Sequence, residues 1–425
     1  MDARFWKAGS RLPSIDAFLD GIADDVHEDR SAIVLLQPGV DSLDVLEELR
    51  VRLSLRQQCW RIYLSEELVE QVDLDSRSAA AISSQLDAAL DGMDILLVHG
   101  LGQLPDELRR RLFGALVSWS ASPVPEGGDS AARVFCIVDP AAALLGCLPS
   151  ASSNSRVELY WWWGFPSSLE LRLATRVLFD DDGADWLECV VGGAAAGDVG
   201  TAAVLWEARP TDALQTRSSL SGLQPDAATA TPNGSYLASS ASASASDGAT
   251  GPRASSAPPS RYRTDWACGR VVWSQEFGLE PSAALVAAQG DAAELDRRLW
   301  RGQAPTVLPL ADGIRLSASQ FLCRRHGQLW YQKLGASPCS NSESLRLEEN
   351  PLDAELGFLE VVLRGSVASQ DERRWLNRVA IARQARNELA HYRPVSRQLF
   401  DSFLLNARDC QSSRSFERQL ARPRR

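Results

Sequence analysis

The chain has 425 residues, of which 45% are hydrophobic and 23% charged, a balance typical of a globular protein with two or three domains. Its net charge of −11 and pI of about 5.1 exclude a protein that binds nucleic acid through its overall charge, so an RNA site needs a local basic patch. The last residues, Arg418, Arg422, Arg424 and Arg425, offer such a patch, and a solvated basic tail is the alternative.

The cysteine pattern predicts free thiols in a reducing compartment. None of the eight cysteines forms a C-x-x-C pair, and only Cys323 lies near a histidine, His326, so no zinc site is expected. The first residues carry charges without an apolar run behind them, and no stretch reaches the roughly 18 apolar residues that a membrane helix needs. We therefore expect a cytoplasmic protein with no metal and no membrane partner.

Residues 1–212 alternate strand-like with helix-like patterns. Helical patterns at 43–53, 82–90 and 105–119 separate the first four strands. Strands that are mostly apolar throughout and alternate with helices predict an α/β domain with a parallel sheet covered on both faces. The apolar runs of strand length are residues 32–36, 60–64, 95–98, 134–138 and 157–163.

The segment from 167 to 210 has helical signals of its own. Ser167 and Glu170 have the spacing of a capping box, in which each side chain satisfies a free amide of the first helical turn. Gly197 and Asp198 then precede an alanine-rich pattern that ends near Trp206. We expect helices here, after the last strand of the sheet.

Residues 213–262 differ in composition from both flanking parts. Residues 239–246 contain only Ser and Ala, and the stretch 216–260 has several prolines, few large apolar residues and very few charges. Such a segment cannot bury enough apolar surface to offset its ordering entropy. It is predicted to be a disordered linker between two folded domains.

Residues 263–425 are helical by pattern and predict an all-α bundle with Pro and Gly at its corners. Two short helices separated by Gly290 come first, and longer ones follow. The expected helices cover 281–289, 291–300, 314–325, 352–363, 371–392 and 396–408.

The turn after the first strand lacks the residues of a phosphate-binding loop. A Walker A loop needs G-x-x-x-x-G-K-[ST], but the turn from Gln37 to Ser42 has no Lys, and Asp41 would repel a phosphate. The third strand ends in His99 where an acid would hold magnesium. The order of elements over residues 20–210 resembles a degenerate P-loop NTPase of the AAA or STAND type. That resemblance implies a sensor or docking domain, with no nucleotide-binding residues and no ATPase activity.

The strongest chemical signal is the run from Arg386 through Asn387 to His391, on a helical pattern that enters from Trp375. At about 100° per residue, Arg386 falls within an apolar stripe of Val379, Ala382 and Leu389, whereas Asn387 and His391 share a neighbouring face. A buried Arg is costly unless it is paired, so we expect Arg386 to meet an acid, a second subunit or an anionic ligand.

These residue types suit a metal-free ribonuclease. A histidine can move the proton of a 2′-hydroxyl or of a leaving oxygen, an arginine can clamp a phosphate as its charge builds, and an asparagine can orient either. Arg386, Asn387 and His391 match the R-x4-6-H motif, and the run R-N-E-L-A-H-Y-R-P resembles the HEPN-like domains of bacterial conflict and phage-defence proteins. The resemblance covers residues 350–410.

The HEPN resemblance implies a helical bundle that forms a homodimer, so that two motifs face one cleft. It implies RNA as substrate, Arg386, Asn387 and His391 as catalytic residues, and no cofactor. The whole chain would be an effector or accessory protein of an antiviral defence system.

Two alternatives stay open. In the first, Arg386 and His391 pair with carboxylates such as Asp353 or Glu360 and only hold the fold. In the second, both domains bind protein or nucleic-acid partners of a defence complex, as a non-catalytic adaptor. His326, next to Arg324 and Arg325, is a lesser candidate that we expect to be structural.

The linker interpretation predicts the outcome of limited proteolysis. Proteases should cut between about residues 216 and 260 and leave two stable fragments, because exposed polar segments are the preferred sites of nicking. Mass spectrometry of the fragments, with circular dichroism of each, checks this. An unfolded fragment on either side of the cut would contradict the two-domain division.

Overall fold

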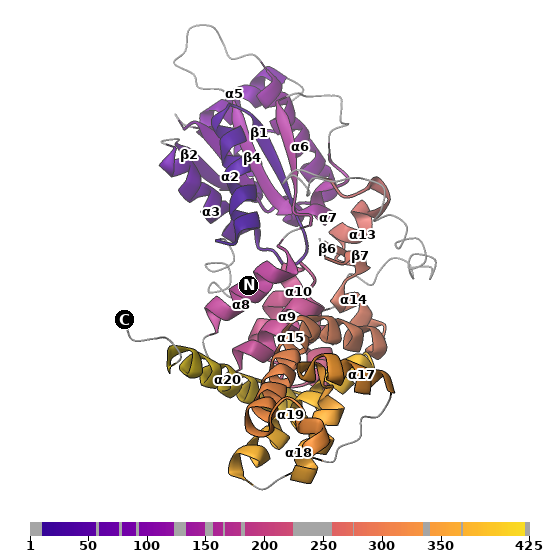
Figure 1. The fold of residues 1–425 in the computed structure, drawn as a ribbon. Helices are drawn as coiled ribbons and strands as arrows, with labels where there is room; N and C mark the ends of the chain where they lie inside the picture. The colour runs from indigo at the N-terminus through magenta and orange to yellow at the C-terminus, as the bar shows by residue number, and fades with distance from the viewer. Residues whose placement is uncertain are drawn as a thin grey trace. The chain divides into compact units, whose positions relative to one another are not determined.

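A computed structural model describes residues 11–420, apart from eleven internal gaps, and its helices and strands are shown in Figure 1. Most of the expected linker, residues 224–256, lies outside the described residues, as do Arg422, Arg424 and Arg425 of the basic tail. The start of the expected linker is helical, in α11 (Ala213–Ser221). The gaps are residues 57–58, 76–78, 91–92, 123–132, 149–155, 165, 180–182, 224–256, 275, 335–340 and 367–368.

The chain divides into two compact units that do not follow chain order simply. The sheet unit comprises Met1–Ala184, Ala194–Arg209 and Ser218–Asp291. The helical unit comprises Asp185–Gly193, Pro210–Arg217 and Ala292–Arg425. An N-terminal α/β part and a C-terminal helical part are therefore confirmed, while the stretch up to Asp291 groups with the sheet.

The sheet unit is built on five parallel strands in the order β2-β3-β4-β1-β5, as the apolar runs predict. All six residues of β1 are buried, because β1 pairs with β4 on one side and β5 on the other. A strand in this central position has both faces covered, which explains its unbroken apolar sequence. The strands are β1 (Ser31–Leu36), β2 (Trp60–Leu64), β3 (Ile95–His99), β4 (Val134–Pro140) and β5 (Val157–Trp161).

Helices cover the two faces of the sheet. Right-handed crossovers place α3, which leads from β1 to β2, on the opposite face from the helices that lead back towards β1. α2 packs against α3, and α5 packs against α6 (Figure 1). The bounds are α2 (Pro13–His27), α3 (Ser42–Leu55), α4 (Ser65–Gln71), α5 (Ala79–Leu90), η1 (Leu101–Gln103), α6 (Asp106–Ala121) and α7 (Ala141–Leu144).

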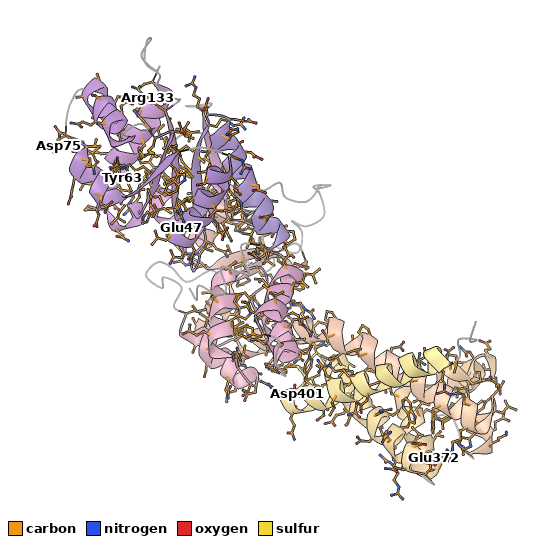
Figure 2. The ribbon with its side chains drawn as sticks, turned by 90° about the vertical axis from the view of Figure 1, so that its left-hand side faces the viewer. Glu47, Tyr63, Asp75, Arg133, Glu372 and Asp401 are labelled. Atoms are coloured by element: carbon orange, nitrogen blue, oxygen red, sulfur yellow. The ribbon has the colours of Figure 1, made fainter. Side chains whose placement is uncertain are left out.

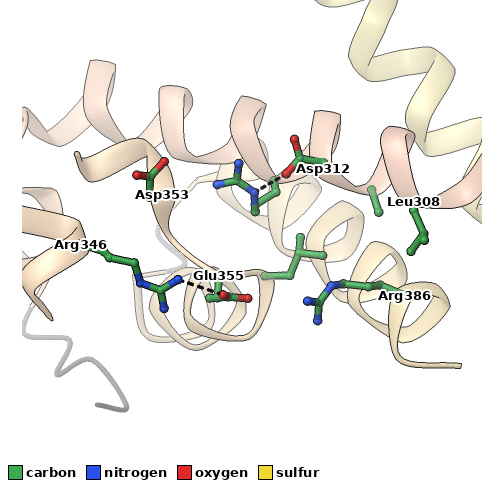
Figure 3. A pocket seen from close by; sticks show the side chains of 9 residues that line it. Leu308, Asp312, Arg346, Asp353, Glu355 and Arg386 are labelled. Carbon is green, nitrogen blue, oxygen red and sulfur yellow. Dashed lines mark hydrogen bonds and ion pairs between the residues drawn. The ribbon is translucent and has the colours of Figure 1, made fainter. Parts of the chain in front are cut away.

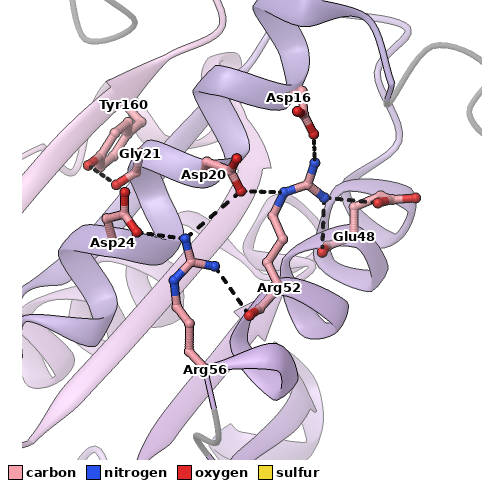
Figure 4. A network of polar contacts seen from close by, with 8 residues as sticks. All are labelled: Asp16, Asp20, Gly21, Asp24, Glu48, Arg52, Arg56 and Tyr160. Atoms are coloured by element: carbon pink, nitrogen blue, oxygen red, sulfur yellow. Dashed lines mark hydrogen bonds and ion pairs between the residues drawn. The ribbon is translucent and has the colours of Figure 1, made fainter.

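Arg52 of α3 and Arg56, the residue that caps this helix, tie it to α2 (Figure 4). Arg52 pairs with Asp16 and, at 3.1 Å, with Asp20, while Arg56 lies 2.6 Å from Asp24. Arg52 is nearly buried, so its acids offset the cost of removing a guanidinium from water. The acids at every fourth position of α2 thus fix the register between the two helices.

The remainder of the sheet unit has the expected capping box at α8, but one stretch that we expected to be helical contains two strands. Ser167 and Glu170 form the capping box of α8, and Asp198 caps α10 by accepting from the amide of Thr201. The region after 263, expected to be helical, instead contains an antiparallel hairpin that turns through Gly278 at a φ of 72°. These elements are α8 (Ser168–Leu178), α10 (Val199–Ala208), η2 (Ser260–Tyr262), α13 (Arg263–Ala267), β6 (Val271–Ser274), β7 (Gly278–Pro281) and α14 (Ala283–Ala288).

One helix of 35 residues, α15 (Ala292–His326), organises the helical unit. The expected break after residue 300 is wrong, because Pro305 and Pro309 lie inside this helix on its exposed side. There the carbonyl groups that lose a helical partner can bond to water, while buried Val307 and Ala311 keep the helix on the core. The other helices are α9 (Ala184–Ala194), α16 (Trp330–Lys333), α17 (Asn341–Glu349), η3 (Pro351–Asp353), α18 (Leu356–Ser366), α19 (Gln370–Ala390) and α20 (Arg397–Leu420).

α9 belongs to the helical unit because its side chains and backbone pack there. Trp186 is buried edge-on against Phe400 of α20, with ring centroids 5.6 Å apart. Gly193 of α9 and Gly302 of α15 meet backbone to backbone, and a Cβ at either would overlap a carbonyl oxygen of the other helix. The crossing therefore requires glycine at both positions.

The end of α15 meets the start of α19 at a buried carboxylate. Glu372, labelled in Figure 2, accepts from the amide and hydroxyl of Ser369 in the capping box of α19. Its other oxygen lies 3.0 Å from Arg325 Nε and 3.6 Å from His326 Nε2. His326 therefore sits at a junction between helices, which fits its expected structural role.

Among the described residues, no helix is long and apolar enough to cross a membrane.

Replacing Gly302 by Ala tests the helix crossing. We expect Gly302→Ala to lower the free energy of unfolding by about 2 kcal/mol or more, because the added methyl group forces the two backbones apart. Gly313→Ala in the same helix is the matched control, since no atom lies within 4 Å of its added Cβ. The control should be neutral or stabilising by up to about 1 kcal/mol. Equal thermal unfolding midpoints for the two variants would contradict the crossing.

Candidate functional site

α19 places the predicted motif at its carboxyl end, and His391 is the residue that caps it. Tyr392 takes a left-handed conformation with φ of 56°, and its amide bonds to the Leu389 carbonyl while the Arg393 amide bonds to Glu388. This pair of bonds is a Schellman motif, although its left-handed position normally favours glycine. The helix ends where the sequence predicts, in a geometry that exposes His391.

Two side chains of α15 hold the end of α19 in place. Trp300 Nε1 donates to the Leu389 carbonyl at 2.7 Å, and its ring lies 5.1 Å from that of Tyr392. Gln303, which is buried, accepts from the Val395 amide at 2.7 Å and donates to the Val395 carbonyl at 3.0 Å. The sequence gives Trp300 and Gln303 no role by itself, because their partners lie about 90 residues further along the chain.

Arg386 is exposed, and the prediction that it lies on the apolar stripe is wrong. The buried face of α19 also includes Arg378 and Ala385, so the centre of that face lies about 50° around the helix axis from Arg386. From the edge of that face the long side chain reaches out of the core. Neither Asp353 nor Glu360 neutralises it: Glu360 pairs with Arg383 and Arg364 instead.

The guanidinium of Arg386 points into a pocket of about 400 Å³ in the helical unit (Figure 3). The walls come from α15, α17, η3, α18 and α19, so segments far apart in sequence meet there. Of the residues that line it, the sequence singles out Arg386 and, as its possible partner, Asp353, whereas nothing local marks Arg346 or Leu308. The lining residues are Leu308, Ala311, Asp312, Arg315, Arg346, Asp353, Glu355, Leu356 and Arg386.

Asn387 and His391 lie elsewhere on α19. Neither belongs to the described residues that line the pocket. His391 leaves the helix about 140° around its axis from Arg386 and about 7.5 Å further along it. Asn387 is half-buried and four residues from His391, so these two share a face. Within one chain, therefore, the motif presents its arginine and its histidine to different surroundings.

In the sheet unit, the chain itself occupies the place where a phosphate would sit. Gly39 has a φ of 87°, and a Cβ there would lie 2.5 Å from the Cα of Gly200 at the start of α10. Asp41 caps α3 by accepting from the Leu43 amide at 2.9 Å. The Leu43 amide at the start of α3 thus already has a carboxylate partner, whose negative charge disfavours a bound anion there.

A buried acid lies beside this turn, at the end of β4. Asp139 accepts from the amides of Leu101 and Gly102 at 3.0 and 3.5 Å, and Arg109 braces the same loop through the Leu101 carbonyl. Burial raises the pKa of Asp139 to about 7, although these amides and Arg109 act to lower it. Burial also lowers the pKa of His99, at the end of β3. Asp139 thus holds the turn after β3.

Comparison with known proteins gives no family for this chain. No protein-family model matches the sequence, and no curated protein matches it. In the part of the chain that the structure describes, no group of three or more His, Cys, Asp or Glu side chains could hold a metal ion.

The pKa of Asp139 predicts a pH dependence of stability. With a folded pKa of about 7 and an unfolded one of about 4, the carboxyl group favours the folded chain at low pH, and this contribution is lost as the pH rises through 7. Asp139→Asn should remove that loss, so the variant's free energy of unfolding relative to wild type should rise between pH 4.5 and 7.5. Denaturant titrations across this range measure it. Asp106→Asn, at a highly exposed acid, should follow the wild-type profile. A variant curve parallel to wild type would contradict the assignment.

Proposed function

We propose that the helical unit is a HEPN-like domain that cleaves RNA without a metal, with Arg386, Asn387 and His391 as its catalytic residues. One observation carries the proposal: Arg386 and His391 are both exposed, and no described residue forms an ion pair or hydrogen bond with the Arg386 guanidinium. A structural arginine would have such a partner, as Arg383 has in Glu360. Uncommitted cationic and imidazole groups on one helix end suit a phosphate substrate.

The reaction follows from the chemistry of these groups. The 2′-oxygen of a ribose attacks the adjacent phosphorus, and the bond from phosphorus to the 5′-oxygen breaks. The 2′-hydroxyl loses a proton and the leaving 5′-oxygen gains one, and His391 carries one of these two transfers. Arg386 stabilises the negative charge that builds on the phosphate oxygens, and Asn387 orients the imidazole from the same helix face.

The reaction needs two copies of the chain. Because Arg386 and His391 leave one helix about 140° apart, a phosphate held by Arg386 is out of line with the His391 of the same chain. The HEPN resemblance implies a homodimer in which two motifs face one cleft, and such a pair supplies the histidine from the second copy.

The sheet unit acts in this proposal as a sensor or docking domain that resembles a degenerate STAND or AAA NTPase. The turn after β1 lies at the carboxyl ends of the neighbouring strands β1 and β4. The strand order reverses at this point, which is where nucleotides bind in parallel α/β folds. Gly200 and Asp41 fill that position, which supports a role other than ATP hydrolysis. The whole chain would then be an effector of an antiviral defence system.

A non-catalytic adaptor is the second candidate, and one observation favours it. Leu169, Leu173 and Val177 form an exposed apolar row along α8, with 61%, 51% and 75% of their surface accessible. Apolar side chains at every fourth position of an exposed helix are typical of a surface that binds another protein.

Substitutions of the two motif residues test the nuclease. In the presence of EDTA, His391→Ala should lower RNA cleavage about 10²–10⁴-fold and Arg386→Ala about 10²–10³-fold, through loss of proton transfer and of charge stabilisation. Both variants should unfold within a few degrees of wild type, because both side chains are exposed. Arg393→Ala removes an exposed cation at the same helix end and should keep full activity.

Mixing the two inactive variants tests the shared site. Random pairing of Arg386→Ala with His391→Ala chains should restore about a quarter of wild-type cleavage, because half of the dimers then hold one intact pair of groups. Mixtures that stay inactive would place both groups in one chain. Cleavage that EDTA abolishes, or that survives both substitutions, would exclude the proposed chemistry, and a wild type that cleaves no RNA would leave the adaptor.

A further inference from the structure

The described residues do not balance all the charges in the pocket beside Arg386. Arg315 lies 2.7 Å from Asp312 and donates to the Leu352 carbonyl at 2.6 Å, which fixes both charges. Arg346 and Glu355 face each other at 3.6 Å. Two charged groups remain without an opposite charge among the described residues: the guanidinium of Arg386 and the carboxylate of Asp353.

These two groups face the pocket from different walls, as Figure 3 shows. The only described partner of the Asp353 carboxylate is the side-chain amide of Asn350, at 3.0 Å from Oδ1, so most of its acceptor capacity is free. A ligand that suits the pocket therefore carries an anionic group at one end and hydrogen-bond donors at the other. Leu308, Ala311 and Leu356 offer apolar surface to the part between.

A nucleotide fits this description better than a free amino acid. Pockets for small ligands start at about 300 Å³, and a volume of about 400 Å³ suits a base with its ribose and phosphate. A free amino acid carries both charges but fills only part of this volume. The flat base can lie against Leu308 and Leu356, while its phosphate reaches Arg386.

The carboxylate decides which base fits. Guanine presents two adjacent donors, N1–H and the N2 amino group, and one carboxylate can accept both. Adenine and cytosine place an acceptor beside their amino group, which a carboxylate repels, and uracil has a single N–H between two carbonyl groups. A free carboxylate on the pocket wall therefore favours guanine.

We propose that this pocket binds the guanosine on the 5′ side of the scissile bond, with its base on Asp353 and its 3′-phosphate on Arg386. The proposal rests on the nuclease function and adds its base preference. The 2′-oxygen of that guanosine forms a bond to phosphorus as the bond to the next 5′-oxygen breaks. The 2′-hydroxyl loses its proton to a general base, and the leaving 5′-oxygen takes a proton from a general acid; His391 carries one of these two transfers. The product therefore ends in guanosine 2′,3′-cyclic phosphate.

Calorimetric titration of the full-length chain with the four 3′-mononucleotides tests the pocket without any cleavage. Guanosine 3′-monophosphate should bind about tenfold or more tightly than the other three, which is the discrimination expected of one good bidentate contact. Asp353→Asn should erase this preference, and Arg386→Gln should make the nucleotide and unphosphorylated guanosine bind alike. Leu308→Trp, which fills the pocket without changing a charge, should abolish binding.

Glu349→Gln is the matched control, because this exposed acid lies between Arg346 and Asp353 in the chain, does not line the pocket and should leave all four affinities unchanged. Equal affinities for the four nucleotides, binding unaffected by Asp353→Asn, or binding of free amino acids instead would overturn the proposal. Sequencing of RNA ends separates the two levels. Cleavage with no preference for guanosine would contradict the proposed guanosine pocket but not the nuclease function. Selective binding of guanosine 3′-monophosphate without cleavage of any RNA would contradict the nuclease function alone.

Discussion

The grip of α15 on the end of α19 is the interaction on which the candidate site depends. Gln303 offers both halves of its amide to the backbone of Val395, and Trp300 covers the last turn of the helix. A buried amide that loses its partners costs about 1–3 kcal/mol, so this contact resists local opening. It holds His391 at an exposed helix end and keeps the strained backbone of Tyr392 in place.

Buried charges of the helical unit are paired within the unit. Buried Arg298 lies 2.9 Å from Glu294, and buried Glu372 meets Arg325 at 3.0 Å. The fold therefore supplies counter-charges where they are needed to offset desolvation. Arg386 and Asp353 are both exposed, so water can solvate their charges, and a ligand that joins the two is our proposal.

At the carboxyl ends of the strands in the sheet unit, polar groups are bonded within the chain. Asp41 accepts from the Leu43 amide of α3, Gly200 packs on Gly39, and Asp139 accepts from the amides of Leu101 and Gly102 after β3. Groups that would meet a phosphate or its metal in a nucleotide-binding fold are thus bonded within the chain. We therefore propose no nucleotide chemistry at these strand ends.

The sequence alone determined the five strands and the capping box of α8, and it predicted the end of the motif helix to within two residues, because period, caps and proline act over a few residues. It also located Arg386, Asn387 and His391, although not their surroundings. Only the tertiary structure decided that α15 runs through Pro305 and Pro309, that the hairpin of β6 and β7 joins the sheet unit, and that Arg386 faces a pocket rather than the core. Each of these depends on contacts between residues far apart in the chain, and no local pattern records such contacts.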